Sequence, residues 1–302
     1  MESTRTKRYI KSRSDLLTGY ALILPTLIIF VILTVYPFFH AFFISLTRWD
    51  GFTDPIFIGL DNFRRLLGDG NVWSALRNNF VFMIFTCLLK VGLGFMIAVF
   101  LRDKFRGVSF FRTIFFLPVI MSFVAVGLIW RFIFNPNFGL INGILFQLGV
   151  SLPRDPILWL GNPTLAMLSI ILVDVWRWTG FHVVLFMAGL QTIPNELYEA
   201  AVVDGCTEWK KFRYITLPLM KGMTMTNFVF CLTGALSVFD LVMTMTGGGP
   251  YGSTRVIALY VYEIAFGASS LMGYATSINI MLFFFILIIT LTLITLMNRN
   301  KD

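Results

Sequence analysis

The stretch Glu199–Pro218, EAAVVDGCTEWKKFRYITLP, is the longest polar interruption in the second half of a very hydrophobic chain. Just before it, Pro194 suits the start of a helix, and Asn195 is predicted to cap that helix. Gly205 can adopt the positive φ that ends a helix. This order predicts a compact helix-turn-helix at a membrane surface rather than a continuous span.

A second helix is predicted to follow the glycine, with Thr207 as its N-cap and Pro218 as its stop. The first helix carries Leu197, Ala200 and Ala201, which we expect to form a small face that another surface can approach closely. An ordinary basic loop requires neither ordered caps nor a small face. We therefore expect this segment to be a docking site for another protein.

Lipid is the expected surrounding of most of the chain. Its 302 residues are 57% hydrophobic and only 13% charged, with a mean hydropathy of +0.79, whereas a soluble domain carries about 25% charged residues. The net charge of +8 is explained by an excess of Lys and Arg in cytoplasmic loops. A nucleic-acid-binding site is not expected, since no polar domain exists to carry a basic patch. The three cysteines show no metal or disulfide spacing, and the first apolar run is too long for a cleavable signal.

The apolar runs predict an all-α integral membrane protein with six spans of about 20 residues or more. The expected spans are residues 16–46, 79–101, 110–134, 164–189, 219–245 and 272–297. Short helices are expected at 61–67 and 140–148. The chain then divides into an N-terminal tail (1–15), a first span with an outer loop (16–78), a five-helix core (79–297) containing the 194–218 segment, and a C-terminal tail (298–302).

Basic residues predict the orientation of these spans. Lys and Arg are more numerous in the N-terminal tail, in the loops 102–112 and 191–221 and at the C-terminus than in the opposite loops. Since cytoplasmic loops carry the excess of Lys and Arg, both termini and the Glu199–Pro218 stretch are expected in the cytoplasm.

No enzyme site is recognisable. His40 and His182 lie in separate apolar runs, and no cluster has metal-ligand spacing. The glycines of Gly247–Gly249 lack the Lys and Ser/Thr of a phosphate loop. We expect this chain to bind no metal or cofactor and to hydrolyse nothing. If it does energised work, another protein must hydrolyse ATP with Mg²⁺.

Polar groups inside spans are functional candidates because lipid makes them costly. Lys90 lies in the second span, Asp174 and Arg177 lie in the fourth, and Asp240 follows Phe239 in the fifth. One interpretation is that these groups pair and hold helices together. The other is that some of them face a water-filled cavity.

An aromatic ring beside a carboxylate is a typical sugar-binding surface, because the ring stacks on a pyranose and the carboxylate accepts from hydroxyls. Asp174, Trp178 and Phe181 share one helix face at four- and seven-residue spacings. Trp176 lies about 200° around the helix from Asp174. The helix geometry therefore favours Trp178 over Trp176 as the partner of this carboxylate.

The polar stretch resembles the EAA loop of the membrane subunits of binding-protein-dependent ABC importers. The matching positions are Glu199, Ala200, Ala201, Asp204, Gly205, Ile215, Leu217 and Pro218. The segments 58–63, 135–142 and 247–250 look like the carbohydrate branch, the maltose-permease-like type I importers. This resemblance implies that the loop docks on an ABC ATPase dimer, that a second permease completes the pathway, and that an extracytoplasmic solute-binding protein delivers sugar.

The resemblance also implies sugar contacts in the spans that flank the loop. The corresponding positions are Asp174, Trp176, Phe181, Cys231, Ala235 and Val238. Here the resemblance favours Trp176 where the helix face favours Trp178, so both stay candidates, as do Phe239, Asp240 and Lys90. The expected function is a sugar importer permease, with an oligosaccharide as cargo, in a bacterial or archaeal cytoplasmic membrane. A glycerol-phosphate or polyol permease of the same family and a secondary transporter are the alternatives; the latter would need coupling carboxylates and repeated halves.

Overall fold

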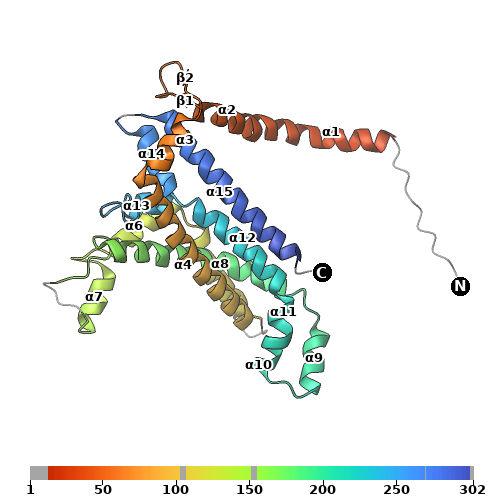
Figure 1. Ribbon diagram of the computed structural model, residues 1–302. Coiled ribbons are helices and arrows are strands. Elements are labelled where there is room, and N and C mark those ends of the chain that lie inside the picture. The colour runs from red at the N-terminus through yellow and green to blue at the C-terminus, as the bar shows by residue number, and fades with distance from the viewer. Residues whose placement is uncertain (1–12, 103–106, 151–154, 269, 300–302) are drawn as a thin grey trace.

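The computed structural model describes residues 13–102, 107–150, 155–268 and 270–299. The basic N-terminal tail up to residue 12, the centre of the 102–112 loop and the last three residues lie outside this description. The described chain is mostly helical, with turns and loops between the helices and one short β-ribbon, which confirms the expected all-α class (Figure 1).

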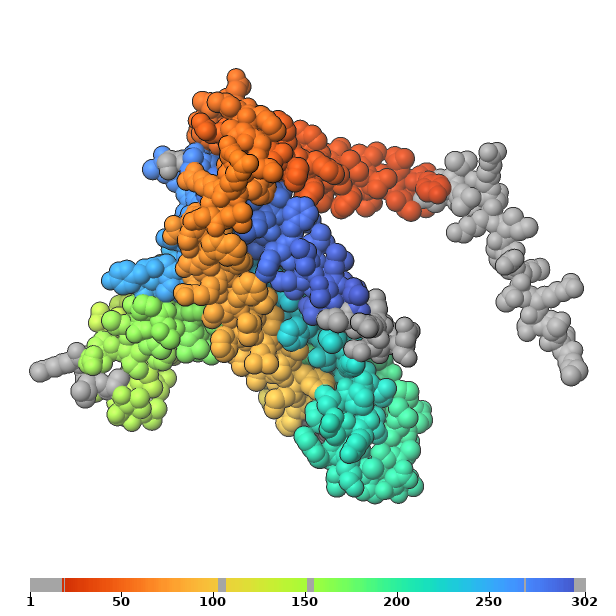
Figure 2. All heavy atoms as spheres, viewed as in Figure 1, coloured from red at the N-terminus to blue at the C-terminus, as the bar shows by residue number. Residues whose placement is uncertain are grey.

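The first apolar run forms one helical arm that extends away from the rest of the molecule (Figure 2). It consists of α1 (Arg13–Phe30), the π-helical turn η1 (Val31–Val35) and α2 (Tyr36–Ser45). Pro37 cannot donate the usual backbone hydrogen bond, and the turn before it widens, with Tyr36 N–H bonding to Val31 O. Its side chains are largely exposed, so the arm must be covered by lipid or another subunit.

A small cap follows the arm. The strands β1 (Thr47–Arg48) and β2 (Ile56–Phe57) pair antiparallel, with Thr47 opposite Phe57. The next helix, α3 (Asp61–Gly68), confirms the short helix expected there. Its buried Asn62 donates to the Ser45 and Thr47 carbonyls at 2.9 and 2.8 Å, which fixes the cap to the end of the arm.

The second span begins earlier than predicted. Helix α4 runs from Gly70 to Phe100, whereas the polarity of residues 70–78 suggested a loop. Those polar side chains bond to distant backbone: Asn78 donates to Gly252 O and Arg255 O, and the Asn79 side chain accepts from Ile257 N. Tertiary hydrogen bonds therefore extend this helix beyond its apolar run.

The third expected span is broken. Helix α5 (Val108–Phe116), the 3₁₀ turn η2 (Leu117–Ile120) and α6 (Phe123–Ile133) bend by 98° at the break. Pro118 lies in the turn η2, and Met121 and Ser122, which separate this turn from α6, have an extended backbone. The prediction of one continuous span over 110–134 was wrong, because the helix is interrupted at the turn that contains Pro118 and the chain changes direction before α6.

The central helix is α8 (Pro163–Leu190), which confirms the fourth expected span. The Asn162 side chain caps it by accepting from Thr164 N and Leu165 N. Gly180 lets α5 approach closely, because a Cβ there would lie 1.9 Å from Phe115 O. Before α8, the short helix α7 (Leu140–Gln147) confirms the second short helix predicted from the sequence.

The remaining elements follow α8 in the chain. They are α9 (Asn195–Val203), α10 (Glu208–Lys211), the π-helical η3 (Phe212–Thr216), α11 (Leu217–Leu219), α12 (Lys221–Leu236), α13 (Asp240–Met245), α14 (Ile257–Phe266) and α15 (Met272–Arg299). Of these, α12 and α13 pack against α8. The expected fifth span, 219–245, is interrupted: α12 ends at Leu236, and the chain changes direction through 237–239 before α13. This break places polar backbone beside α8, next to the cavity described below.

Four described helices are long and apolar enough to cross a membrane, namely Tyr20–Ser45, Gly70–Phe100, Pro163–Leu190 and Met272–Thr295. Two bent pairs pass the same test together, Val108–Ile120 with Phe123–Ile133 and Glu208–Leu219 with Lys221–Leu236. Six spans are reached only if each bent pair counts as one. The chain is therefore a multi-pass membrane protein with four to six candidate spans.

Candidate functional site

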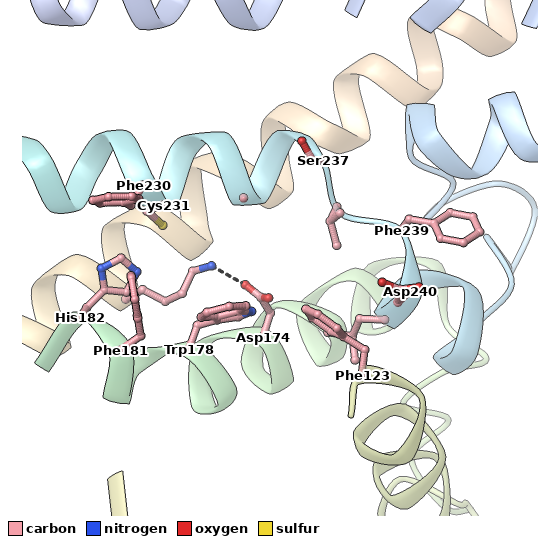
Figure 3. A pocket seen from close by; sticks show the side chains of 14 residues that line it. Phe123, Asp174, Trp178, Phe181, His182, Phe230, Cys231, Ser237, Phe239 and Asp240 are labelled. Carbon is pink, nitrogen blue, oxygen red and sulfur yellow. Dashed lines mark hydrogen bonds and ion pairs between the residues drawn. The ribbon is translucent and has the colours of Figure 1, made fainter. Parts of the chain in front are cut away.

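A cavity of about 330 Å³ lies between α4, α8, α12 and the chain break before α13 (Figure 3). Aromatic, charged and small side chains from these elements converge on it. The lining residues are Lys90, Phe123, Asp174, Trp178, Phe181, His182, Phe230, Cys231, Gly234, Ser237, Val238, Phe239, Asp240 and Leu241. Most of the residues proposed from the sequence as pathway candidates are thus gathered at one place.

A buried ion pair forms one wall of the cavity. Lys90 Nζ donates to Asp174 Oδ2 at 2.7 Å, and each residue is only 4% exposed. The pair joins α4 to α8, as the structural interpretation of these charges requires. Because both residues also line the cavity, the two interpretations made from the sequence are compatible.

Aromatic rings cover the α8 side of the cavity. Trp178 stacks edge-on against Phe181 with ring centroids 5.8 Å apart, and Phe181 makes a similar contact with Phe230 at 6.0 Å. Phe123, at the start of α6, lies 6.1 Å from Trp178. On the opposite side, Asp240 is exposed at the break before α13, and no ion pair to it is found among the described residues.

Two candidates lie outside this cavity. Trp176 does not line it, is 43% exposed and packs edge-on against Trp130 at 5.5 Å. Ala235 is buried but does not line it. The position of Trp178 agrees with the helix-face argument and not with the position that the family resemblance indicated.

Some lining residues were not proposed from the sequence. Phe230 and Gly234 on α12, and Ser237 at its C-cap, recur at four- and three-residue spacing, a signal that could have identified them. Phe123 gave no such signal, because only the break before α6 brings it to the cavity.

Arg177 has a structural position. Its Nη2 donates to Met121 O at 2.6 Å and to Val119 O at 3.3 Å, at the break between η2 and α6. Its guanidinium lies 3.6 Å above the Phe123 ring. This arginine replaces hydrogen bonds that the broken helix lacks, and it orients an aromatic ring of the cavity.

The Glu199–Pro218 segment lies at the far end of the bundle from β1, β2 and α3 (Figures 1 and 2). As predicted, α9 ends in a glycine turn: Gly205 has φ +71°, Gly205 N bonds to Val202 O, and Cys206 N bonds to Ala201 O. This pair of bonds is the Schellman pattern of helix ends. The turn therefore has a defined shape.

The second helix of the segment also begins as predicted, since the Thr207 hydroxyl accepts from Lys210 N. Two details were wrong. Pro194, not Asn195, occupies the cap position of α9, because the proline already holds the extended conformation there. Pro218 does not stop the second helix, which widens into η3 ahead of the proline and continues to Leu219 before a 63° bend.

One side of this helix pair is packed and the other is open. Tyr198 is buried and its hydroxyl lies 2.9 Å from the buried Thr216 hydroxyl, which ties α9 to the second helix. Ala201 also faces inward, contrary to the expected small face, while Ala200 stays exposed. Exposed apolar side chains cover the open side, with Val203 87% exposed. Such a surface is typical of an interaction site.

The remaining motif positions divide between these two sides. Glu199, Asp204, Gly205, Leu217 and Pro218 are exposed, and Ile215 is half-buried. Two aromatic residues of the second helix are also exposed, namely Trp209 and Tyr214. The motif thus combines a fixed backbone turn with side chains accessible to a partner.

Comparison with known proteins identifies the family. Residues 90–300 match the family model described as "Binding-protein-dependent transport system inner membrane component". The chain is 38% identical over 278 residues to the probable ABC transporter permease protein YurN of Bacillus subtilis, which covers 91% of this chain and 92% of that protein. It is 35% identical over 279 residues to the trehalose/maltose transport system permease protein MalF of Thermococcus litoralis, with 92% of each chain covered.

Another relative is the diacetylchitobiose uptake system permease protein NgcF of Streptomyces coelicolor, 38% identical over 267 residues that cover 85% of this chain and 75% of that protein. A crystal structure of a bacterial ABC transporter that imports the acidic polysaccharide alginate contains a chain with the same fold, at TM-score 0.83 and 24% identity, over 96% of this chain and 98% of that one. The chain therefore belongs to the family of binding-protein-dependent inner membrane transport components, and within it to the permease subunits of carbohydrate ABC importers.

Proposed function

We propose that this chain forms one half of the translocation pathway of an ATP-driven importer whose cargo is a neutral oligosaccharide. The observation that carries the proposal is the convergence of Trp178, Phe181 and Asp240 on one cavity between candidate spans. Aromatic rings stack on the apolar faces of pyranoses, and carboxylates accept hydrogen bonds from their hydroxyls. A cavity of this size and composition suits a sugar unit.

The charges of the cavity support a neutral cargo. The positive charge of Lys90 is paired with Asp174, and Asp240 adds a second carboxylate. Arg177 donates to backbone carbonyls instead of facing the cavity. An acidic saccharide or a glycerol phosphate would therefore meet a carboxylate, with no unpaired Lys or Arg among the described residues that line the cavity. The relatives named for trehalose/maltose and diacetylchitobiose support an oligosaccharide.

We assign ATPase docking to the open side of α9–α11. The exposed motif residues would contact the partner, namely Glu199, Ala200, Asp204, Gly205, Leu217 and Pro218, while the buried Ala201 and the half-buried Ile215 would hold the helix pair in shape. Binding and hydrolysis of ATP with Mg²⁺ are assigned to two ABC ATPase subunits, since members of this family are transport subunits. A second permease and an extracytoplasmic solute-binding protein complete the assembly.

A mechanical connection links α9–α11, which we call the docking segment, to the cavity. The Tyr198–Thr216 contact joins α9 to the second helix, which bends at the buried Met220 into α12. Helix α12 carries Phe230 and Cys231 into the cavity wall. Movement of the docking segment on ATP binding would thus displace one wall of the pathway and alternate its access.

The proposed topology has six spans, each bent pair counting as one, with both termini and α9–α11 in the cytoplasm. The excess of Lys and Arg on that side supports this orientation. The proposed location is the cytoplasmic membrane of a bacterium or archaeon, a setting consistent with relatives from both.

Reconstitution tests the function. The chain would be assembled in liposomes with its second permease, its ATPase and its solute-binding protein, and ATP-dependent uptake would be measured for mono-, di- and oligosaccharides, neutral and acidic. We expect saturable uptake of a neutral oligosaccharide. Uptake restricted to acidic sugars or to glycerol phosphate would refute the proposed cargo, and uptake without ATP would refute the importer mechanism.

A further inference from the structure

A second cavity, of about 480 Å³, lies beside the docking segment, where the C-terminal ends of α4 and α8 meet α5 and the start of α9. Its polar lining residues are Arg102, Arg112, Gln191 and Asn195, and three apolar side chains from α8 and the α8–α9 turn complete it. No carboxylate is found among the described residues that line this cavity. It is separate from the cavity lined by Trp178 and Asp240, and the proposed function does not use it.

Both arginines lack a counter-charge within the described part of the chain. The ion pairs found there involve neither Arg102 nor Arg112. The Nε of Arg112 is buried and has no hydrogen-bond partner among the described residues. Arg102 is held in place by its guanidinium, which lies 3.4 Å above the Tyr198 ring. Two arginines that line one cavity, with no carboxylate among its described lining residues, favour an anionic ligand.

The other polar groups at the cavity can also donate. Gln191 and Asn195 carry amide N–H₂ groups, and Asn195 is the first residue of the nine-residue helix α9. The N-terminus of a helix favours negative charge. Glu196, in the first turn of α9, does not line the cavity. The donors therefore come from three different parts of the fold and surround one volume.

The general excess of basic residues at a cytoplasmic membrane face explains why arginines occur here. It does not explain why two of them share one cavity, or why the buried Arg112 Nε has no partner in the part of the chain that the structure describes, since such groups normally find one. We propose that this cavity binds a phosphate group, carried by the headgroup of an acidic phospholipid or by a free phosphate. A bound phosphate would join α4 and α5 to the start of α9.

Two ligand arms test the proposal on the purified full chain in detergent. In the first, native mass spectrometry counts retained lipid after addition of dioleoyl phosphatidylglycerol or, as the neutral comparison, dioleoyl phosphatidylcholine. In the second, calorimetric titration measures binding of inorganic phosphate against chloride at matched ionic strength. We expect one-to-one, saturable binding in at least one arm, and the arm that responds identifies the source of the phosphate.

Substitutions locate the site. Arg112→Gln and Arg102→Gln should each weaken binding about tenfold, the typical loss of one charge-assisted hydrogen bond, while Arg112→Lys should retain most of it. Arg213→Gln, which removes an exposed arginine at the same end of the bundle but outside the cavity, should bind as the wild type does.

Several outcomes would overturn the proposal. One is equal retention of both lipids by the wild-type chain together with no phosphate binding, a result that needs no variant to fold. Another is equal binding by the wild type and Arg112→Gln. A third is that the Arg102 and Arg112 variants bind lipid and phosphate as the wild type does but co-purify with less ATPase. That result would assign the arginines to a protein contact instead.

Discussion

Neutralising either member of the Lys90–Asp174 pair should destabilise the bundle severely. The two side chains meet at 2.7 Å between α4 and α8, and both are almost completely buried. Lys90→Met would leave a carboxylate without its partner, and Asp174→Asn would leave an ammonium group without its partner. Each single change therefore strands one charge in a region where charges are expensive.

The size of the loss follows from this geometry. Breaking a buried ion pair costs about 3–5 kcal/mol, because the remaining charge is uncompensated. Both residues line a cavity that water can enter, so we expect the lower end of this range, about 3 kcal/mol, or roughly a hundredfold in the unfolding equilibrium. Replacing both residues, as Lys90→Met with Asp174→Leu, should recover most of the loss, since apolar pairs often match buried ion pairs in stability.

Unfolding in mixed micelles, titrated with a denaturing detergent and followed by tryptophan fluorescence, measures these differences. Asp240→Asn is the matched control, because this carboxylate borders the same cavity and has no ion pair among the described residues; it should leave stability nearly unchanged. If each single variant were as stable as the wild type, or if the double variant lost the sum of both effects, the reasoning about this pair would be refuted.

Two further predictions concern the ends of the bundle. Gly205→Val forces a β-branched residue into φ +71° at a cost of about 1–2 kcal/mol, and should leave membrane insertion intact but uncouple ATP hydrolysis from uptake. The control is Gly222→Val, which changes an exposed helical glycine nearby and should keep normal coupling. Coupled transport by both variants would exclude the docking assignment. At the other end, burial raises the pKa of Asp69, but hydrogen bonds from Tyr274, Tyr260 and Asn71 outweigh it and lower the pKa below its usual 3.8. This carboxylate therefore stabilises the fold above about pH 4 and loses that contribution as the pH falls through its lowered pKa. The free energy of unfolding should fall less between pH 7 and pH 3 in the double variant Tyr260→Phe with Tyr274→Phe than in the wild type. An equal fall in both proteins would disprove the assignment.

The docking segment was the most predictable part of the molecule because local chemistry determines it. A glycine with positive φ, a threonine cap and a proline before α9 act within a few residues of their positions in the chain. The EAA motif added the family, which the comparisons confirmed. Even here, the ends of the helices shifted, because a proline can be accommodated by a widened turn rather than a stop.

The cavity was only partly predictable because distant segments build it. Helical periodicity selected Asp174, Trp178 and Phe181 correctly as one face. Periodicity could not reveal that the third and fifth spans break, and those breaks bring Phe123 and Asp240 to the cavity. The early start of α4 was missed for the same reason, since its polar side chains bond to backbone more than 150 residues away.

The central claim is that sugar passes the cavity lined by Trp178, and the matched pair of neighbouring tryptophans on α8 tests it most directly. Trp178 faces the cavity and Trp176 packs against Trp130 outside it. ATP-dependent uptake should be measured in liposomes containing the complete importer with either Trp178→Ala or Trp176→Ala. Uptake should fall at least tenfold for Trp178→Ala and less than twofold for Trp176→Ala, on the scale of one lost aromatic contact in a binding site. Unchanged uptake by Trp178→Ala, or a loss confined to Trp176→Ala, would contradict the account.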